Sequence, residues 1–127
     1  LKRGLPQLVD FLKRVPGVQL LSSQVTADAF WWVKFRIDLR HPLAWSVVHE
    51  LGHVLNDVSV SEKLPTVFKP VSPPPYLNGG PHEFLCWVIE SEYNYIDPAW
   101  IAEELQNRMP RPVDDQAQWN DDAAEDV

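Results

Sequence analysis

The stretch PLAWSVVHELGHVLN, residues 42–56, decides the fold because it predicts a long helix in the middle of the protein. Its apolar residues recur at the spacing of one broad helix face: Ala44, Val47, Val48, Leu51, Val54 and Leu55. Pro42 suits the first turn of this helix. Gly52 in its interior costs about 1 kcal/mol relative to alanine, which indicates a close approach by another part of the chain. We therefore expect this helix to be central.

The flanking sequence predicts a short sheet and two further main helices. A short helix is expected over Leu5–Val15, ended by Pro16-Gly17, and a short strand over Val18–Leu21. Alternating polar and apolar residues predict a strand over Phe30–Leu39. Residues 57–81 hold no long element, apart from a brief strand at 66–68. Two helices are expected after them, at His82–Glu92 and, behind an Asp97 cap, at Ala99–Arg108. The class expected is α+β, with two to four strands packed on about three helices.

Length and charge indicate one domain, expected over residues 1–109, and an acidic flexible tail over 110–127. The chain has 127 residues, enough for one core. Six of its 18 acids and none of its 11 bases lie in residues 113–127, so the first 112 residues carry 12 acids against 11 bases. No nucleic-acid partner is expected from that balance. No apolar run is long enough for a membrane span, and a single cysteine, Cys86, allows no internal disulfide, so a cytoplasmic protein is expected. The sequence does not indicate the oligomeric state.

The residues that carry chemistry are His49, Glu50 and His53, a HExxH pattern inside the expected central helix. Positions i and i+4 lie on one helix face about 6 Å apart, so both imidazoles can reach one metal ion. Two neutral nitrogens and an open position suit Zn²⁺, which lowers the pKa of a bound water to about 7. Glu50 is then the candidate general base. The alternative is a core helix that happens to hold these three polar side chains.

A third ligand is needed, because two histidines do not hold zinc tightly. On the helix expected over 82–92, Glu83, Cys86 and Glu90 share a face, and Glu83 begins that helix. Glu83 is the preferred third ligand. Glu90, His82 and Cys86 stay open as alternatives.

The HELGHVL segment, residues 49–55, resembles the active-site helix of zincin metallopeptidases. A second helix that supplies a glutamate is similar to the gluzincin arrangement. In its small size, the chain also resembles the ImmA/IrrE family of bacterial and phage metallopeptidases. The resemblance implies a minimal zincin domain, with zinc bound by His49, His53 and Glu83 and with Glu50 as the catalytic base. It implies a peptide or protein substrate. The strand at Phe30–Leu39 is a candidate for the sheet edge that would pair with an extended substrate by backbone hydrogen bonds.

Two other functions stay open beside a metallopeptidase of narrow substrate range. One is a non-catalytic, zinc-bearing interaction or regulatory module, and the other is a zinc hydrolase that acts on something other than a peptide. The six tryptophans add an expectation about packing. Trp45, Trp87 and Trp100 are expected in the core, Trp31 and Trp32 are candidates for a binding surface, and Trp119 is expected in the flexible tail.

Overall fold

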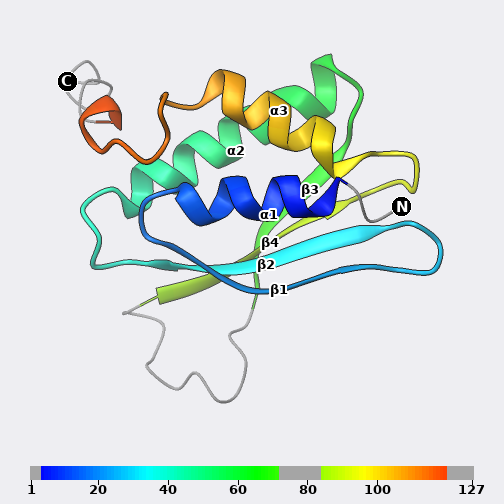
Figure 1. Cartoon of the computed structure of the whole chain (residues 1–127), viewed down its shortest axis with the longest axis horizontal. Helices are drawn as coiled ribbons and strands as arrows, with labels where there is room; N and C mark the ends of the chain where they lie inside the picture. Colours follow the sequence, from blue (N-terminus) through cyan, green and yellow to red (C-terminus); the bar gives the residue numbers. More distant parts are fainter. Residues whose placement is uncertain (1–3, 72–83, 120–127) are drawn as a thin grey trace.

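The fold is a four-stranded antiparallel sheet with three helices (Figure 1), in a computed structural model that describes residues 4–71 and 84–119. The elements in chain order are α1 (Leu5–Arg14), β1 (Val18–Val25), β2 (Trp31–Asp38), α2 (Ala44–Ser61), β3 (Thr66–Val71), β4 (Phe84–Ser91) and α3 (Pro98–Arg108). The strand order in the sheet is β1-β2-β4-β3. The α+β class expected from the sequence is confirmed, but the arrangement does not fit the minimal zincin domain that the resemblance implies.

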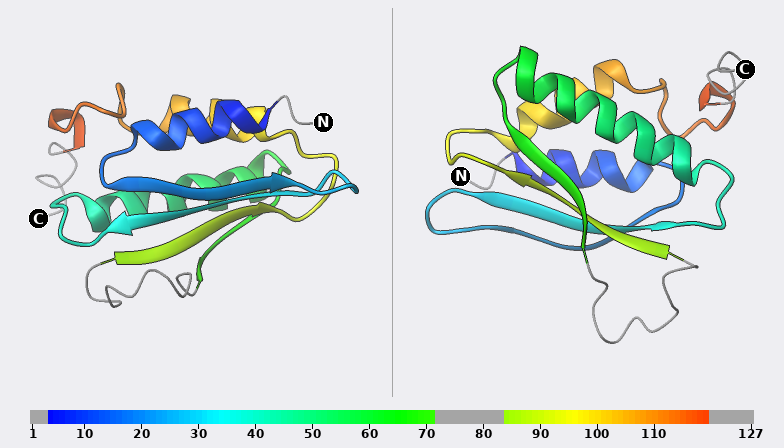
Figure 2. Two further views of the ribbon diagram at one scale, coloured as in Figure 1. Left: turned by 60° about the horizontal axis from the view of Figure 1, so that its bottom comes forward. Right: turned by 180° about the vertical axis from the view of Figure 1, so that it is seen from behind.

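All three helices lie on one face of the sheet (Figure 2), and the core fills the space between the two layers. The alternation seen in β2 explains which face is covered, since Val33, Phe35 and Ile37 are fully buried against the helices while Lys34 between them is exposed. α2 contacts β3 and α3, and α3 also contacts α1. None of the helices in the described part of the chain is long and apolar enough to cross a membrane.

The three helices other than the one expected at 82–92 begin close to the predicted residues, but α2 ends at Ser61, five residues after the predicted Asn56. α2 begins at Ala44, two residues after Pro42, and the backbone N–H of Leu43 just before it donates to Nδ1 of His41 at 3.0 Å. The Asp97 carboxylate accepts from the backbone N–H of Ala99 at 2.9 Å, the N-cap that the sequence predicted for α3.

The prediction of a helix over His82–Glu92 is wrong, because residues 84–91 form β4. This strand lies in the middle of the sheet, where Trp87 pairs with Phe35 of β2 and Ile89 pairs with Phe68 of β3. Successive residues of β4 are buried on both faces: Trp87 and Ile89 belong to the core under the helices, whereas Cys86 and Val88 are buried on the opposite face. A strand buried on both faces reads as a continuous apolar run, which periodicity does not distinguish from a buried helix.

The strand predicted at Phe30–Leu39 does form, as β2, but it is not an edge. It lies between β1 and β4, so its backbone is paired on both sides and the expected substrate-pairing role is wrong. The edge strand beside α2 is β3 instead. A Cβ atom added to Gly52 would lie 3.9 Å from the ring of Phe68 on β3, so the close approach expected at this glycine is an ordinary van der Waals contact.

Part of the expected tail packs on the domain. Val113 and Trp119 are buried in the core, and the indole N–H of Trp119 donates to the carbonyl of Val113 at 2.9 Å. Asp114 forms an ion pair with Arg14 of α1 at 3.5 Å. This segment lies near the N-terminal half of α2 (Figures 1 and 2), while residues 120–127 lie outside the described part. Trp119 is therefore a core residue and not a tail residue.

The other tryptophans follow the expectations only in part. Trp87 is buried, as expected. Trp31 is buried as well, so the expectation that it lines a binding surface is wrong. Trp45 and Trp100 are 59% and 46% exposed, so the expectation that they lie in the core is wrong.

Candidate metal site

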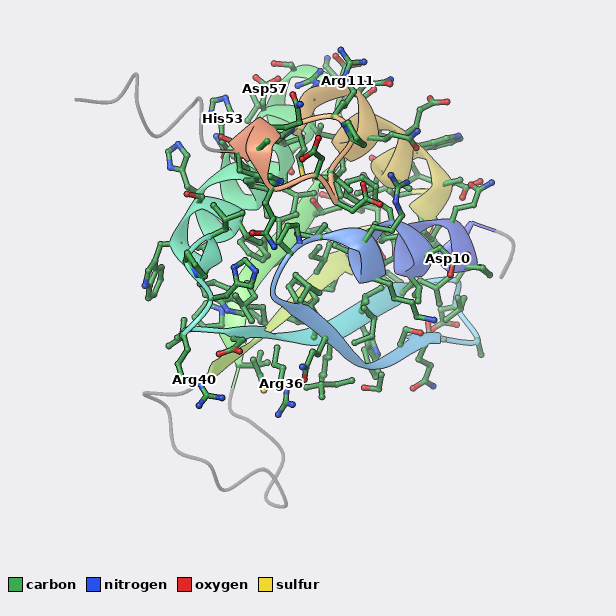
Figure 3. All side chains as sticks on the ribbon, turned by 60° about the vertical axis from the view of Figure 1, so that its left-hand side comes forward. Asp10, Arg36, Arg40, His53, Asp57 and Arg111 are labelled. Atoms are coloured by element: carbon green, nitrogen blue, oxygen red, sulfur yellow. The ribbon has the colours of Figure 1, made fainter. Side chains whose placement is uncertain are left out.

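His49 and His53 lie side by side on the outer face of α2. Because α2 turns Val47, Leu51 and Val54 toward the core, the residues about half a turn away face solvent, and both histidines are exposed. Their ring centroids are 6.3 Å apart and their planes are within 7° of parallel. Figure 3 shows His53 projecting from α2, one turn before Asp57. The pairing of the two imidazoles that the HExxH spacing predicted is therefore present.

The histidine pair fits a zinc ion once the two rings tilt toward each other. Zinc–nitrogen bonds of about 2.0 Å in a tetrahedral site place the two nitrogens about 3.3 Å apart. The ring centroids of His49 and His53 are 6.3 Å apart, but both side chains are exposed, and other rotamers can bring their nitrogens closer together. Two donors of this type suit Zn²⁺ and fill half of its four positions.

Glu50 is half-buried on the flank of α2 that turns toward α3. Asp57 lies on the same flank, seven residues along the helix, and its carboxylate is paired with the Arg108 guanidinium of α3. Arg108 also pairs with Glu62 at 3.4 Å and with Glu104 at 3.0 Å. Glu50, the residue expected to be the general base, therefore lies between the exposed histidines and the contact of α2 with α3.

Asp57 is an acidic group near the histidine pair that the sequence analysis did not single out. The hydrogen bond from Arg108, followed by that from the Ser61 hydroxyl, lowers the pKa of Asp57, and the charge of His53 acts in the same direction. The hydrogen bond to Asp57 in turn raises the pKa of Arg108. The spacing of Asp57 four residues after His53 is the signal that could have found it. Its pairing with Arg108 indicates a structural role.

Two of the alternative third ligands, Cys86 and Glu90, lie on the wrong side of the sheet. In β4 they are paired with Arg36 and Trp32 of β2, and directly opposite residues share a face. Figure 3 shows Arg36 on the side of the sheet away from His53. Glu90 forms an ion pair with Lys69 at 3.3 Å, and burial raises the pKa of the Cys86 thiol. Neither side chain can join His49 and His53, so these alternatives are wrong.

Glu83 and His82 lie outside the described residues. The expected geometry, in which Glu83 begins a helix that crosses the first, no longer holds, because the next residue, Phe84, begins β4 and pairs with Asp38. Within residues 4–71 and 84–119, no group of three or more His, Cys, Asp or Glu side chains is arranged to hold a metal ion. The structure therefore brings together two of the expected ligands, and Glu83 stays a prediction.

The comparisons with known proteins add no family to these observations. No protein-family model matches the chain, and neither a curated protein nor a solved structure shows significant similarity to it.

Proposed function

We propose that this protein is a zinc-dependent, peptidase-like hydrolase whose ion is held by His49 and His53. The single observation that carries the proposal is the pair of near-parallel imidazoles one turn apart on the exposed face of α2. When bound there, zinc supplies an acidified water and polarises a carbonyl oxygen. Glu50, between the two histidines in sequence, holds and transfers the proton as general base. Glu83 is proposed as the third ligand.

The fold limits what such a site can act on. Both histidines are exposed on α2, and three hollows in the described part of the protein lie elsewhere, around α1 and the β4–α3 loop. A site of this kind offers few walls to bury a substrate. We therefore propose an extended peptide or a protein surface as the substrate, not a small molecule enclosed in a pocket.

The experiment separates metal binding from catalysis by two substitutions. The wild-type protein and Glu50→Gln are loaded with zinc, dialysed, and compared for metal content and for cleavage of a fluorogenic peptide library. Both should retain zinc, and only the wild type should cleave. His41→Asn is the matched control, because the ring nitrogen of His41 accepts a hydrogen bond from the backbone N–H of Leu43, just before α2, and an asparagine oxygen can replace it. Cleavage that survives in Glu50→Gln, or its absence from the zinc-loaded wild type, contradicts the hydrolase proposal.

A second candidate function, a non-catalytic zinc-bearing interaction module, is favoured by the residues beside the histidines. Trp45 and Val60 lie on the same stripe of α2 and are 59% and 71% exposed. Large exposed apolar side chains on one helix face are typical of an interface. Two copies that meet along this stripe would supply four imidazoles to one ion, a closed site. Zinc-dependent dimerisation with one zinc per two chains and no peptide cleavage would select this function over the first.

A further inference from the structure

A group of exposed aromatic side chains lies at the end of the molecule formed by the β4–α3 loop. Tyr93 and Tyr95 in this loop are 51% and 58% exposed, and their rings stack with centroids 5.5 Å apart. Trp100, in the first turn of α3, is 46% exposed. Aromatic rings are enriched at protein interfaces because they bury much area at a small cost in side-chain entropy. Their exposure together points to a binding surface.

Two hollows meet at Trp100, and we call them together the Trp100 groove. One, of about 200 Å³, lies between the indole, Tyr95 and the backbone near Ala29. The other, of about 440 Å³, runs between α1 and α3, and its walls include Asp10 and Glu103. Because Trp100 lines both, one extended segment laid along α3 could contact the indole and both hollows.

The charge around the Trp100 groove is negative. The acidic residues that line the groove are Asp10, Asp97 and Glu103, and the Asp97 carboxylate also accepts the N-cap hydrogen bond of α3.

Among the described residues that line the groove, one cation does not offset this charge. It belongs to Arg14, which is paired with Asp114 at 3.5 Å. The combination of aromatic faces and carboxylates is complementary to cations, because the ring quadrupole and the acids attract the same charge.

We propose that the Trp100 groove binds an arginine- or lysine-containing segment of a protein partner. A cationic side chain lies over the indole of Trp100, flanked by Tyr95, and the following basic residues face Glu103 and Asp10 along the α1–α3 hollow. The same charge repels nucleic acid and other polyanions. This surface lies on α3, the β4–α3 loop and α1, so it does not depend on the histidines of α2.

The test uses the whole protein and two peptides of equal length. The first is a rhodamine-labelled peptide of four Arg-Gly repeats, and the second carries citrulline, an uncharged analogue of nearly the same shape, at each arginine. Fluorescence anisotropy at low salt should give a Kd below about 1 mM for the arginine peptide and at least tenfold weaker binding of the citrulline peptide. Equal affinity for the two peptides, or no binding of the arginine peptide, would overturn the proposal.

Substitutions locate the site on the protein. Trp100→Ala should weaken binding of the arginine peptide at least fivefold, and Glu103→Gln at least twofold. Trp45→Ala is the matched control, since Trp45 is also exposed but lies on α2, and it should leave the Kd within twofold. Both tryptophan variants remove exposed rings, and circular dichroism checks that each is folded. A Trp100→Ala protein that is folded and binds as tightly as the wild type places the peptide elsewhere and contradicts the proposal.

Discussion

Replacing Trp119 with alanine should destabilise the whole domain, although the composition around this residue is that of an acidic tail. Trp119 is 1% exposed, and its indole N–H is bonded to the carbonyl of Val113. A buried tryptophan removes about 200 Å² from water, worth about 5 kcal/mol at about 25 cal/mol per Å². The remaining methyl group recovers part of this, and residues 110–119 can move away from the helices instead of leaving a cavity. We therefore expect a loss of about 3 kcal/mol, at the low end of the range for such substitutions.

Urea unfolding followed by far-ultraviolet circular dichroism measures this loss. With a slope of about 1.5 kcal/mol per molar urea, the midpoint of Trp119→Ala should fall by about 2 M. Trp45→Ala is the control, because its side chain is 59% exposed and its loss should change the free energy of unfolding by less than about 0.5 kcal/mol. If Trp119→Ala unfolds at the wild-type midpoint, residues 110–119 do not belong to the core and the packing described here is wrong.

Three further substitutions test the packing and charge of the helices. Gly4→Ala places a Cβ atom 1.8 Å from the Asp97 carboxylate and 2.6 Å from the backbone nitrogen of Ala99. This substitution should lower the free energy of unfolding, measured in urea, by about 1–3 kcal/mol. An unchanged urea midpoint would contradict this contact. Gly52→Ala meets only an ordinary contact with Phe68, so thermal unfolding should show a gain of up to about 1 kcal/mol, and a loss would mean a tighter approach of β3. Asp57→Asn should be less stable than the wild type at pH 7, because the Arg108 hydrogen bond lowers the pKa of Asp57 in the folded state. That difference should persist above about pH 4 and shrink as the pH falls further through the lowered pKa; a difference that does not change between pH 7 and pH 2 would contradict the pairing.

The helix signals in the sequence were strong enough to predict α1, α2 and α3. Proline near the helix start, Asp97 as a cap and the apolar spacing of residues 44–55 each act locally, so they need no knowledge of the rest of the fold. β4 was missed because its environment is not local. It is buried by β2 and β3 at its sides and covered on both faces, so the same apolar run fits a helix or a strand. The aromatic and β-branched residues Trp87, Val88 and Ile89 were the available signal for a strand.

The sequence could predict only the part of the candidate site that is formed by nearby residues of one helix. The spacing of His49 and His53 on one helix is sufficient to bring their rings together. The prediction of the third ligand depended on a second helix. Residues 84–91 form a strand instead, and the side chains of the alternatives Cys86 and Glu90 lie on the face of the sheet away from the helices. The exposure of Trp100 could have been predicted from helix geometry. The buried residues of α3, among them Ile101 and Leu105, lie on one face of the helix, and Trp100 lies outside that face.

Zinc content measured by mass spectrometry on the wild type and on His53→Ala tests the central claim most directly. After zinc loading and dialysis against a weak chelator, the wild type should retain close to one zinc per chain, and His53→Ala should retain almost none. Equal zinc content in the two proteins, or no zinc in either, would contradict the assignment of His49 and His53 as metal ligands.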